Sequence, residues 1–195
     1  MGQHFINISP ENKLPPQKGR LLISEPFLAD PYFRRTVVLL CEHNEEGSFG
    51  FILNKFIDVG VNELIEDLPQ LGSRVSMGGP VQSGNLYYIH TLGQKIEGSV
   101  EIVKGVYMGG SFDMLKILLK SGTIKKGMIR FFVGYAGWGH DQLAEEMKER
   151  SWLVTPADPK ALMDSKKDDL WRQTLLEMGE EYAMLANFPE DPSLN

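Results

Sequence analysis

The chain has 195 residues, of which 42% are hydrophobic and 24% charged, and it carries a formal net charge of −6. This length favours one domain with enough chain to bury a core, and the acidic balance disfavours nucleic acid or an anionic membrane as the main partner. A single cysteine, Cys41, excludes an internal disulfide and is typical of a reducing compartment. We find no secretory signal and no apolar run long enough to cross a bilayer, so a cytoplasmic protein without a membrane partner is expected.

The first part of the chain predicts a flexible arm at residues 1–18, followed by a domain. Apolar and β-branched patterning, punctuated by glycine and proline, predicts strands. In chain order these are expected at 20–24, 35–43, 49–54, 74–77, 86–92, 99–103 and 106–108. Helices are expected at 61–68, which Pro69 ends, and from a Ser111 cap to Gly122.

Residues 127–154 form the block around which the rest is expected to fold. A strand at 129–133 is followed by GYAGWG at 134–139, which the three glycines favour as a turn. Asp141 stands where an N-cap is expected, and a helix should follow it, with Glu145, Glu146 and Glu149 on its solvated face. A short strand at 151–154 completes the block, and the chain then becomes helical, with segments beginning near Asp158 and at 170–178 and 181–188.

Strands in hairpins with interspersed helices predict an α+β fold. We expect a single domain at 19–188, built on a mixed, mostly antiparallel sheet or a flattened β-barrel, surrounded by helices and with a helical C-terminal part. A polar tail is expected at 189–195.

Four segments carry a resemblance to a known family. They are GRLLISEPFLADPYFRRTVVLLCEHNEEGSFGFILNK at 19–55, GGPV at 78–81, GYAGWGHDQLAEEM at 134–147 and SWLVTPAD at 151–158. In this order they resemble the AlgH/YqgE family of bacterial cytoplasmic proteins. The resemblance implies a compact α+β domain on a flattened, barrel-like sheet, and a loose label of transcriptional regulator. It implies no agreed reaction, cofactor or substrate. One departure is local: the family usually has glycine where this chain has Asp141.

Each candidate chemical group also has a structural interpretation. Cys41 and His43 are predicted to share a strand face, but Cys41 follows apolar residues and is expected in the core. No metal-binding spacing joins His43, His90 and His140, and no nucleophile or dinucleotide motif is present, so neither a metal nor a cofactor is expected. Trp138 either fills the core, which is favoured, or lines a concave surface.

The candidate binding surface comprises five residues: His43, Asn54, Tyr135, Trp138 and Gln142. The first hypothesis is a non-enzymatic binding or regulatory protein that contacts a protein or small ligand through the 134–141 segment. The second is an enzyme or small-molecule binder with a pocket around His43, Asn54 and Trp138. The third, a DNA-associated regulator, is disfavoured by the net charge and by the lack of a helix-turn-helix pattern. Partner identity and oligomeric state are left open.

Overall fold

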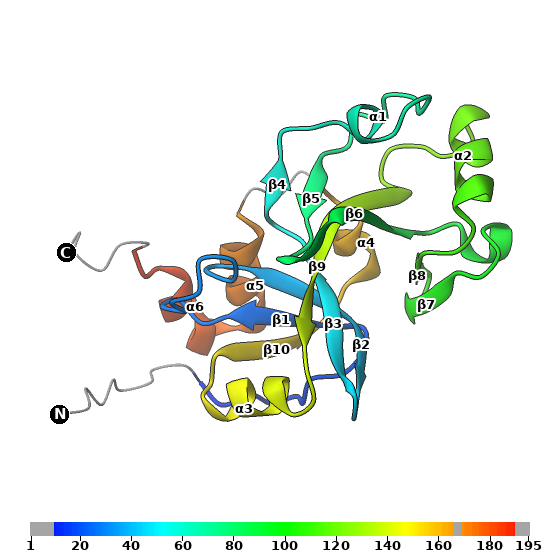
Figure 1. The fold of residues 1–195 in the computed structure, drawn as a ribbon. Coiled ribbons are helices and arrows are strands. Elements are labelled where there is room, and N and C mark those ends of the chain that lie inside the picture. The colour runs from blue at the N-terminus through cyan, green and yellow to red at the C-terminus, as the bar shows by residue number, and fades with distance from the viewer. Residues whose placement is uncertain (1–9, 166–168, 190–195) are drawn as a thin grey trace.

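The computed structural model describes residues 10–165 and 169–189 (Figure 1). Its strands are β1 (Arg20–Ser24), β2 (Val37–Asn44), β3 (Gly47–Ile52), β4 (Phe56–Ile57), β5 (Val75–Met77), β6 (Val81–His90), β7 (Val100–Val103), β8 (Val106–Met108), β9 (Ile129–Trp138) and β10 (Trp152–Pro156). Its helices are α1 (Val61–Leu64), the 3₁₀ turn η1 (Gly93–Lys95), α2 (Phe112–Lys120), α3 (Gln142–Lys148), α4 (Pro159–Leu162), α5 (Leu170–Met178) and α6 (Glu180–Ala186).

The ten strands form one sheet with the order β10-β1-β2-β3-β9-β6-β8-β7, and the short strands β4 and β5 join it beside β9. Neighbouring strands are antiparallel except for β5 and β9, which are parallel. The predicted α+β class with a mixed, mostly antiparallel sheet is therefore confirmed. Of the two alternatives, the open sheet is the one observed, because its path ends at β10 and at β7.

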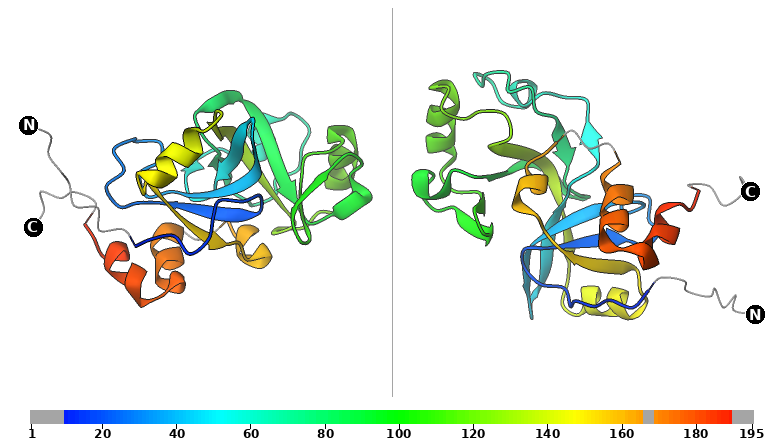
Figure 2. Two further views of the ribbon diagram at one scale, coloured as in Figure 1. Left: turned by 90° about the horizontal axis from the view of Figure 1, so that it is seen from below. Right: turned by 180° about the vertical axis from the view of Figure 1, so that it is seen from behind.

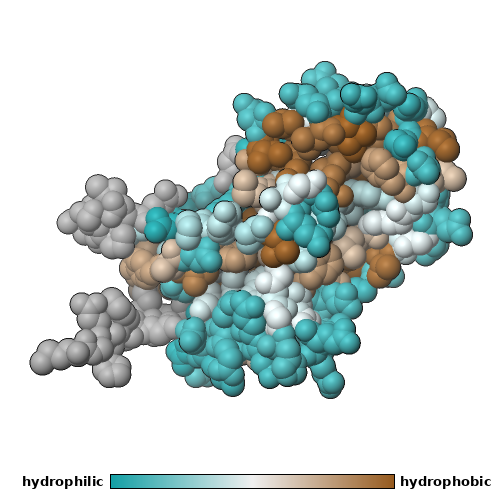
Figure 3. All heavy atoms as spheres, viewed as in Figure 1, coloured by the Kyte–Doolittle hydropathy of each residue, from teal (hydrophilic) through white to brown (hydrophobic). Residues whose placement is uncertain are grey.

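Three apolar clusters give the molecule its layers. Seen from below, α3 and the pair α5–α6 lie on opposite faces of the sheet (Figure 2). One face buries Val37, Leu39, Phe51 and Phe132 against α4, α5 and α6, and the other buries Val38, Leu40, Ile52 and Trp138 against α3. A third cluster fills the lobe formed by α1, α2 and the first half of β9. Apolar atoms remain at the surface of this lobe below α1, whereas the α3 end is hydrophilic (Figure 3).

The prediction of a glycine-rich turn at 134–139 is wrong, because β9 continues through it to Trp138. Gly134 has φ +67°, and a Cβ there would lie 2.4 Å from the carbonyl oxygen of Gly79. The glycine thus permits both the left-handed angle and the close approach of a neighbouring chain segment. It shifts the alternation of β9, so that Phe132 and Tyr135, three residues apart, pack on the same face.

Several element boundaries differ from prediction. Helix α1 ends at Leu64 because Ile65 already has extended angles (φ −132°, ψ 117°). Strand β6 begins at Val81, which pairs with Tyr135 before the ladder is interrupted and resumes at Leu86. Ser111 caps α2 as expected, its hydroxyl accepting the amide N–H of Met114.

Part of the arm predicted at 1–18 is described, from Pro10 onward. The Asn12 side chain donates to the carbonyl of Trp152 at 2.8 Å and accepts the amide N–H of Val154 at 2.7 Å. It thus pairs with the free edge of β10, as an additional strand would. Residues 1–9 and 190–195, which hold half of the predicted arm and nearly all of the predicted tail, lie outside the described residues. No helix within the described ranges is long and apolar enough to cross a membrane.

Candidate functional site

An open groove of about 440 Å³ lies where the β2–β3 hairpin meets the end of β9 and the start of β6. Its lining combines carboxylates, aromatic rings and bare glycine backbone. The lining residues are Glu42, Asn44, Glu46, Gly47, Ser48, Phe49, Val81, Tyr135, Gly137, Trp138 and Gly139. The volume falls within the ordinary range for a small-ligand or side-chain binding site.

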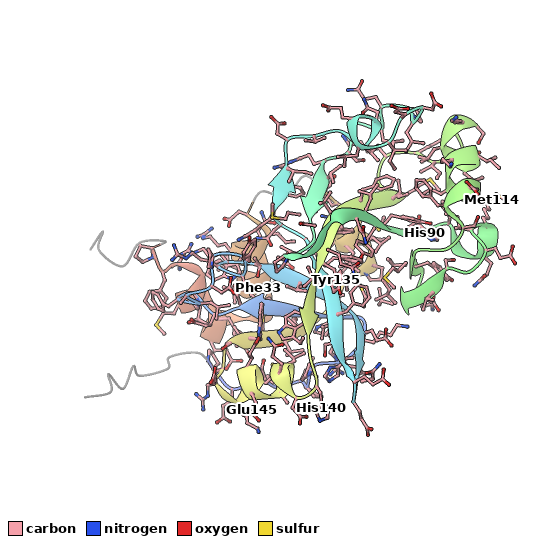
Figure 4. The ribbon with its side chains drawn as sticks, in the orientation of Figure 1. Phe33, His90, Met114, Tyr135, His140 and Glu145 are labelled. Carbon is pink, nitrogen blue, oxygen red and sulfur yellow. The ribbon has the colours of Figure 1, made fainter. Side chains whose placement is uncertain are left out.

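Aromatic rings provide the apolar side of this groove. Tyr135 of β9, which pairs with Val81 of β6 and is labelled in Figure 4, packs edge-on against Phe49 with ring centroids 5.4 Å apart. Tyr87 contacts Tyr135 in the same way at 5.7 Å, and Phe51 continues the cluster toward the core. Gly137 keeps space open beside Tyr135, since a Cβ at this position would lie 3.0 Å from the Tyr135 ring. The groove therefore rests on rings that are fixed by mutual packing.

Carboxylates provide its polar side. Glu42 and Glu46 are exposed, and neither forms an ion pair with a cation among the described residues. Asn44 orders this tip of the hairpin: its side chain donates to Glu42 Oε1 and accepts the Glu46 amide N–H, each at 2.9 Å. Two carboxylates beside an aromatic surface form an environment that favours a cationic group, by Coulomb attraction and by cation–π contact.

The structure divides the five predicted site residues among different places. Tyr135 lies in the groove. Trp138 is only 5% exposed and packs with Trp152 beneath α3, on the opposite face of the sheet from Tyr135, although it borders the groove at the end of β9. The favoured interpretation of Trp138 as a core residue is thus confirmed.

His43 and Asn54 lie at different places in the fold and do not form one pocket. The Nδ1 atom of His43 lies 2.7 Å from Ser48 Oγ, and Ser48 pairs with Trp138 across the strands. Asn54, beyond the other end of β3, is occupied with backbone groups, accepting the Val37 N–H and donating to the Arg35 carbonyl. The structure therefore places His43 near Trp138 but does not bring Asn54 to them.

Gln142 belongs to the architecture of α3. Its Oε1 accepts the Gly139 amide N–H at 3.1 Å, and its Nε2 donates to Glu146 at 3.0 Å. Asp141 occupies the predicted N-cap position, but its side chain forms no capping bond and its φ is +58°. The capping prediction for Asp141 is wrong, and the left-handed angle explains why glycine suits this position.

Glu146 also differs from prediction. It was expected on the solvated face of its helix, but it is half-buried, and Oε2 accepts the indole N–H of both Trp138 and Trp152, at 2.8 and 2.7 Å. This carboxylate joins α3, β9 and β10. Its role is structural, because both indoles are buried.

The described residues that line the groove form no acid–base or nucleophilic set. Cys41 is 2% exposed, and burial raises the pKa of its thiol. A register shift between Leu40 and Glu42 places Cys41 and His43 on opposite faces, so the prediction of a shared face is wrong. The His43–Ser48 pair has no carboxylate hydrogen-bonded to the imidazole in the described part of the chain.

The three histidines considered for a metal are separated. His90 pairs with Ile129 at the start of β9, whereas His140 follows its other end (Figure 4). His140 Nδ1 donates to the carbonyl of Glu45 at 2.5 Å and so ties the hairpin to the start of α3. Within residues 10–165 and 169–189, no group of three histidine, cysteine or acidic side chains could hold a metal ion.

The groove residues that sequence reasoning missed include Glu42, Glu46, Phe49 and Val81. The predicted hairpin at 44–47 was the available signal, since loops at strand ends often carry binding groups. What the pattern did not reveal was the bulge near Cys41, which turns Glu42 to the face of Phe49.

Comparison with known proteins supports one family. The AlgH-like family profile matches residues 21–183. A UPF0301 protein from Chlorobaculum tepidum is 42% identical over 177 residues, covering 91% of this chain and 95% of the relative. Another from Bacteroides thetaiotaomicron is 41% identical over 185 residues, covering 94% of each chain.

Two solved structures share the fold. The solution structure of AlgH from Pseudomonas aeruginosa has a TM-score of 0.71 at 29% identity, covering 88% of this chain and 94% of that one. A crystal structure of a Corynebacterium diphtheriae protein has a TM-score of 0.74 at 24% identity, covering 93% and 96%. The chain therefore belongs to the AlgH-like family, which also bears the name UPF0301.

Proposed function

We propose that this protein is a non-enzymatic, cytoplasmic binding or regulatory protein whose partner inserts a cationic group into the groove at the β2–β3 hairpin. One observation carries the proposal: two carboxylates that form no ion pair with a described residue, Glu42 and Glu46, border a packed aromatic surface formed by Phe49 and Tyr135. Lysine, arginine and amine groups share the required chemistry, whether they belong to a protein partner or to a small polyamine.

The acidic groove argues against nucleic acid at this site, because phosphates would be repelled by Glu42 and Glu46. A regulatory role through protein contact accommodates the same residues. The enzymatic alternative receives no support from the groove, since its carboxylates are solvated and the described lining residues include no activated nucleophile.

An NMR titration can test the proposal. We would add spermidine, or a short arginine- and lysine-containing peptide, to ¹⁵N-labelled protein at low salt. Amide shifts are expected to concentrate at 42–49 and 135–139, and the stronger of the two probes identifies the source of the cation. Because the contact is electrostatic, added salt should weaken it.

The decisive variant is Glu42→Gln/Glu46→Gln, which removes two charges without changing side-chain size. Its matched control is Glu66→Gln/Glu180→Gln, which alters two exposed carboxylates: Glu66 follows α1, and Glu180 lies on α6. The proposal predicts that only the first pair loses probe binding. It fails if neither probe shifts the groove amides at about 5 mM, near the weakest affinity of interest, or if both double variants bind as the wild type does.

A further inference from the structure

A second concave region is basic, in contrast to the acidic groove at the β2–β3 hairpin. Two hollows of about 360 and 350 Å³ adjoin, since both are lined by Gly127, Lys160 and Met163. They extend between the β7–β8 hairpin, the turn at 125–128 and helix α4. We call this region the lysine groove.

Three lysines from distant parts of the sequence line it. Lys104 comes from the β7–β8 turn, Lys126 from the turn before β9, and Lys160 from α4. All three are exposed, and none of their ammonium groups forms an ion pair or hydrogen bond with another described residue. Convergence of three unneutralised charges in a protein of net charge −6 marks a local site of positive potential.

A fourth cation lies behind this surface. Arg130 is 1% exposed, and its guanidinium donates to the carbonyls of Leu162 and Leu53, each at 2.7 Å, and to Ser76 Oγ at 3.0 Å. Burial lowers the pKa of Arg130 to about 10, an effect that Asp164 opposes, so the group remains charged at neutral pH. Asp164 is the one carboxylate among the lining residues, and its charge is shared with Arg130.

The lysine groove also has neutral surfaces suited to an organic ligand. Val106, Pro159 and Met163 give it an apolar side. Gly127, with φ +84°, has no side chain to fill the space, and its amide N–H donates to no acceptor in the described part of the chain. Ammonium groups and a free amide can bind phosphate oxygens, while the apolar side can contact a carbon skeleton.

We propose that the lysine groove binds a small organic phosphate, of the size of a nucleoside diphosphate. The dimensions favour a small ligand over a nucleic-acid strand, because three lysines within two adjoining hollows do not form the extended basic stripe that tracks a polymer backbone. This site is separate from the acidic groove at the β2–β3 hairpin and does not depend on the function proposed for it.

Isothermal titration calorimetry and ¹⁵N NMR with inorganic pyrophosphate and with ADP test the proposal. Both probes are expected to shift amides at 104–106, 125–128 and 159–165, and ADP should bind more tightly, because only ADP can contact the apolar side. Lys104→Ala, Lys126→Ala and Lys160→Ala should each weaken binding roughly three- to tenfold. The triple variant should abolish it. Lys148→Ala, which removes an exposed lysine on α3, is the control and should bind as the wild type does.

Because the three lysines are exposed, the variants should keep the wild-type circular dichroism spectrum and melting temperature, which separates loss of binding from loss of fold. The proposal is overturned if neither probe binds at about 5 mM, if the shifted amides lie elsewhere, or if the triple variant binds normally. It is also overturned if the probes fail while a single-stranded oligonucleotide binds and the lysine variants abolish that binding, since the site would then serve nucleic acid.

Discussion

The carboxylate of Glu146 offers the sharpest test of what holds this fold together. Replacement by leucine preserves approximate side-chain volume but removes the acceptor shared by the indoles of Trp138 and Trp152. These indoles belong to residues that are 5% and 1% exposed, so water cannot readily replace the lost partner. A buried donor left unsatisfied costs about 1–3 kcal/mol. Because Glu146 itself is half-buried, we expect each of the two indole donors to cost the lower part of this range. The free energy of unfolding should then fall by about 2–3 kcal/mol in total.

Urea unfolding followed by tryptophan fluorescence and circular dichroism measures this loss directly. Glu145→Leu is the matched control, because Glu145 is exposed on the same helix and its carboxylate pairs, among the described residues, with Lys148 alone, a contact worth about 0.5 kcal/mol or less. A double-mutant cycle adds Trp138→Phe, which removes one donor and should reduce the penalty of Glu146→Leu by about 1 kcal/mol. The reasoning is refuted if Glu146→Leu and Glu145→Leu have equal free energies of unfolding, or if the cycle shows no coupling.

Two further predictions concern backbone strain and pH. Asp141→Gly should stabilise the fold by about 0.5 kcal/mol, because φ +58° is costly for a residue with a Cβ; urea unfolding beside Asp141→Ala, which keeps the Cβ and should gain nothing, checks the cause. The buried His90 ring accepts the Leu92 N–H and donates to the Gly109 carbonyl, and burial lowers its pKa, an effect that the Gly109 bond opposes. His90 therefore binds a proton more readily in the unfolded chain than in the folded chain. The contribution of neutral His90 to the free energy of unfolding should be fully present above pH about 6.5 and should be lost as the pH falls below that value. Melting temperatures across this range should show a shallower decline for His90→Gln, and equal slopes would contradict the assignment.

Local patterns predicted much of the secondary structure. The β7–β8 hairpin, the Ser111 cap of α2 and the helical C-terminal part follow from side-chain periodicity and from residues that act within a few positions of themselves. Asp158 illustrates the point, since its carboxylate accepts the amide N–H groups of Lys160 and Ala161, as expected for a residue that begins a helix. Such interactions depend only on residues that are close in sequence, so they can be predicted without the rest of the chain.

The errors arise where one segment contacts another that is distant in sequence. Gly134 favours a turn when read alone, but its neighbour in the fold is Gly79, whose carbonyl would collide with any Cβ there. The left-handed backbone at Gly134 changes the alternation of β9, so Tyr135 faces the groove while Trp138 enters the core. A similar register shift near Cys41 turns Glu42 toward Phe49.

Both candidate sites depend on such non-local events. The acidic groove exists because the register shift on β2 and the change of alternation at Gly134 of β9 bring Glu42 and Tyr135 to one face of the sheet. The lysine groove exists because the sheet order places the β7–β8 turn near the start of β9 and α4, so Lys104, Lys126 and Lys160 converge from separate segments. In the sequence these lysines have no regular spacing, and a net charge of −6 gives no indication of a local basic site. Opposite charge on two separate concave surfaces predicts opposite ligand chemistry, so a cation and an organic phosphate should bind this protein without displacing one another.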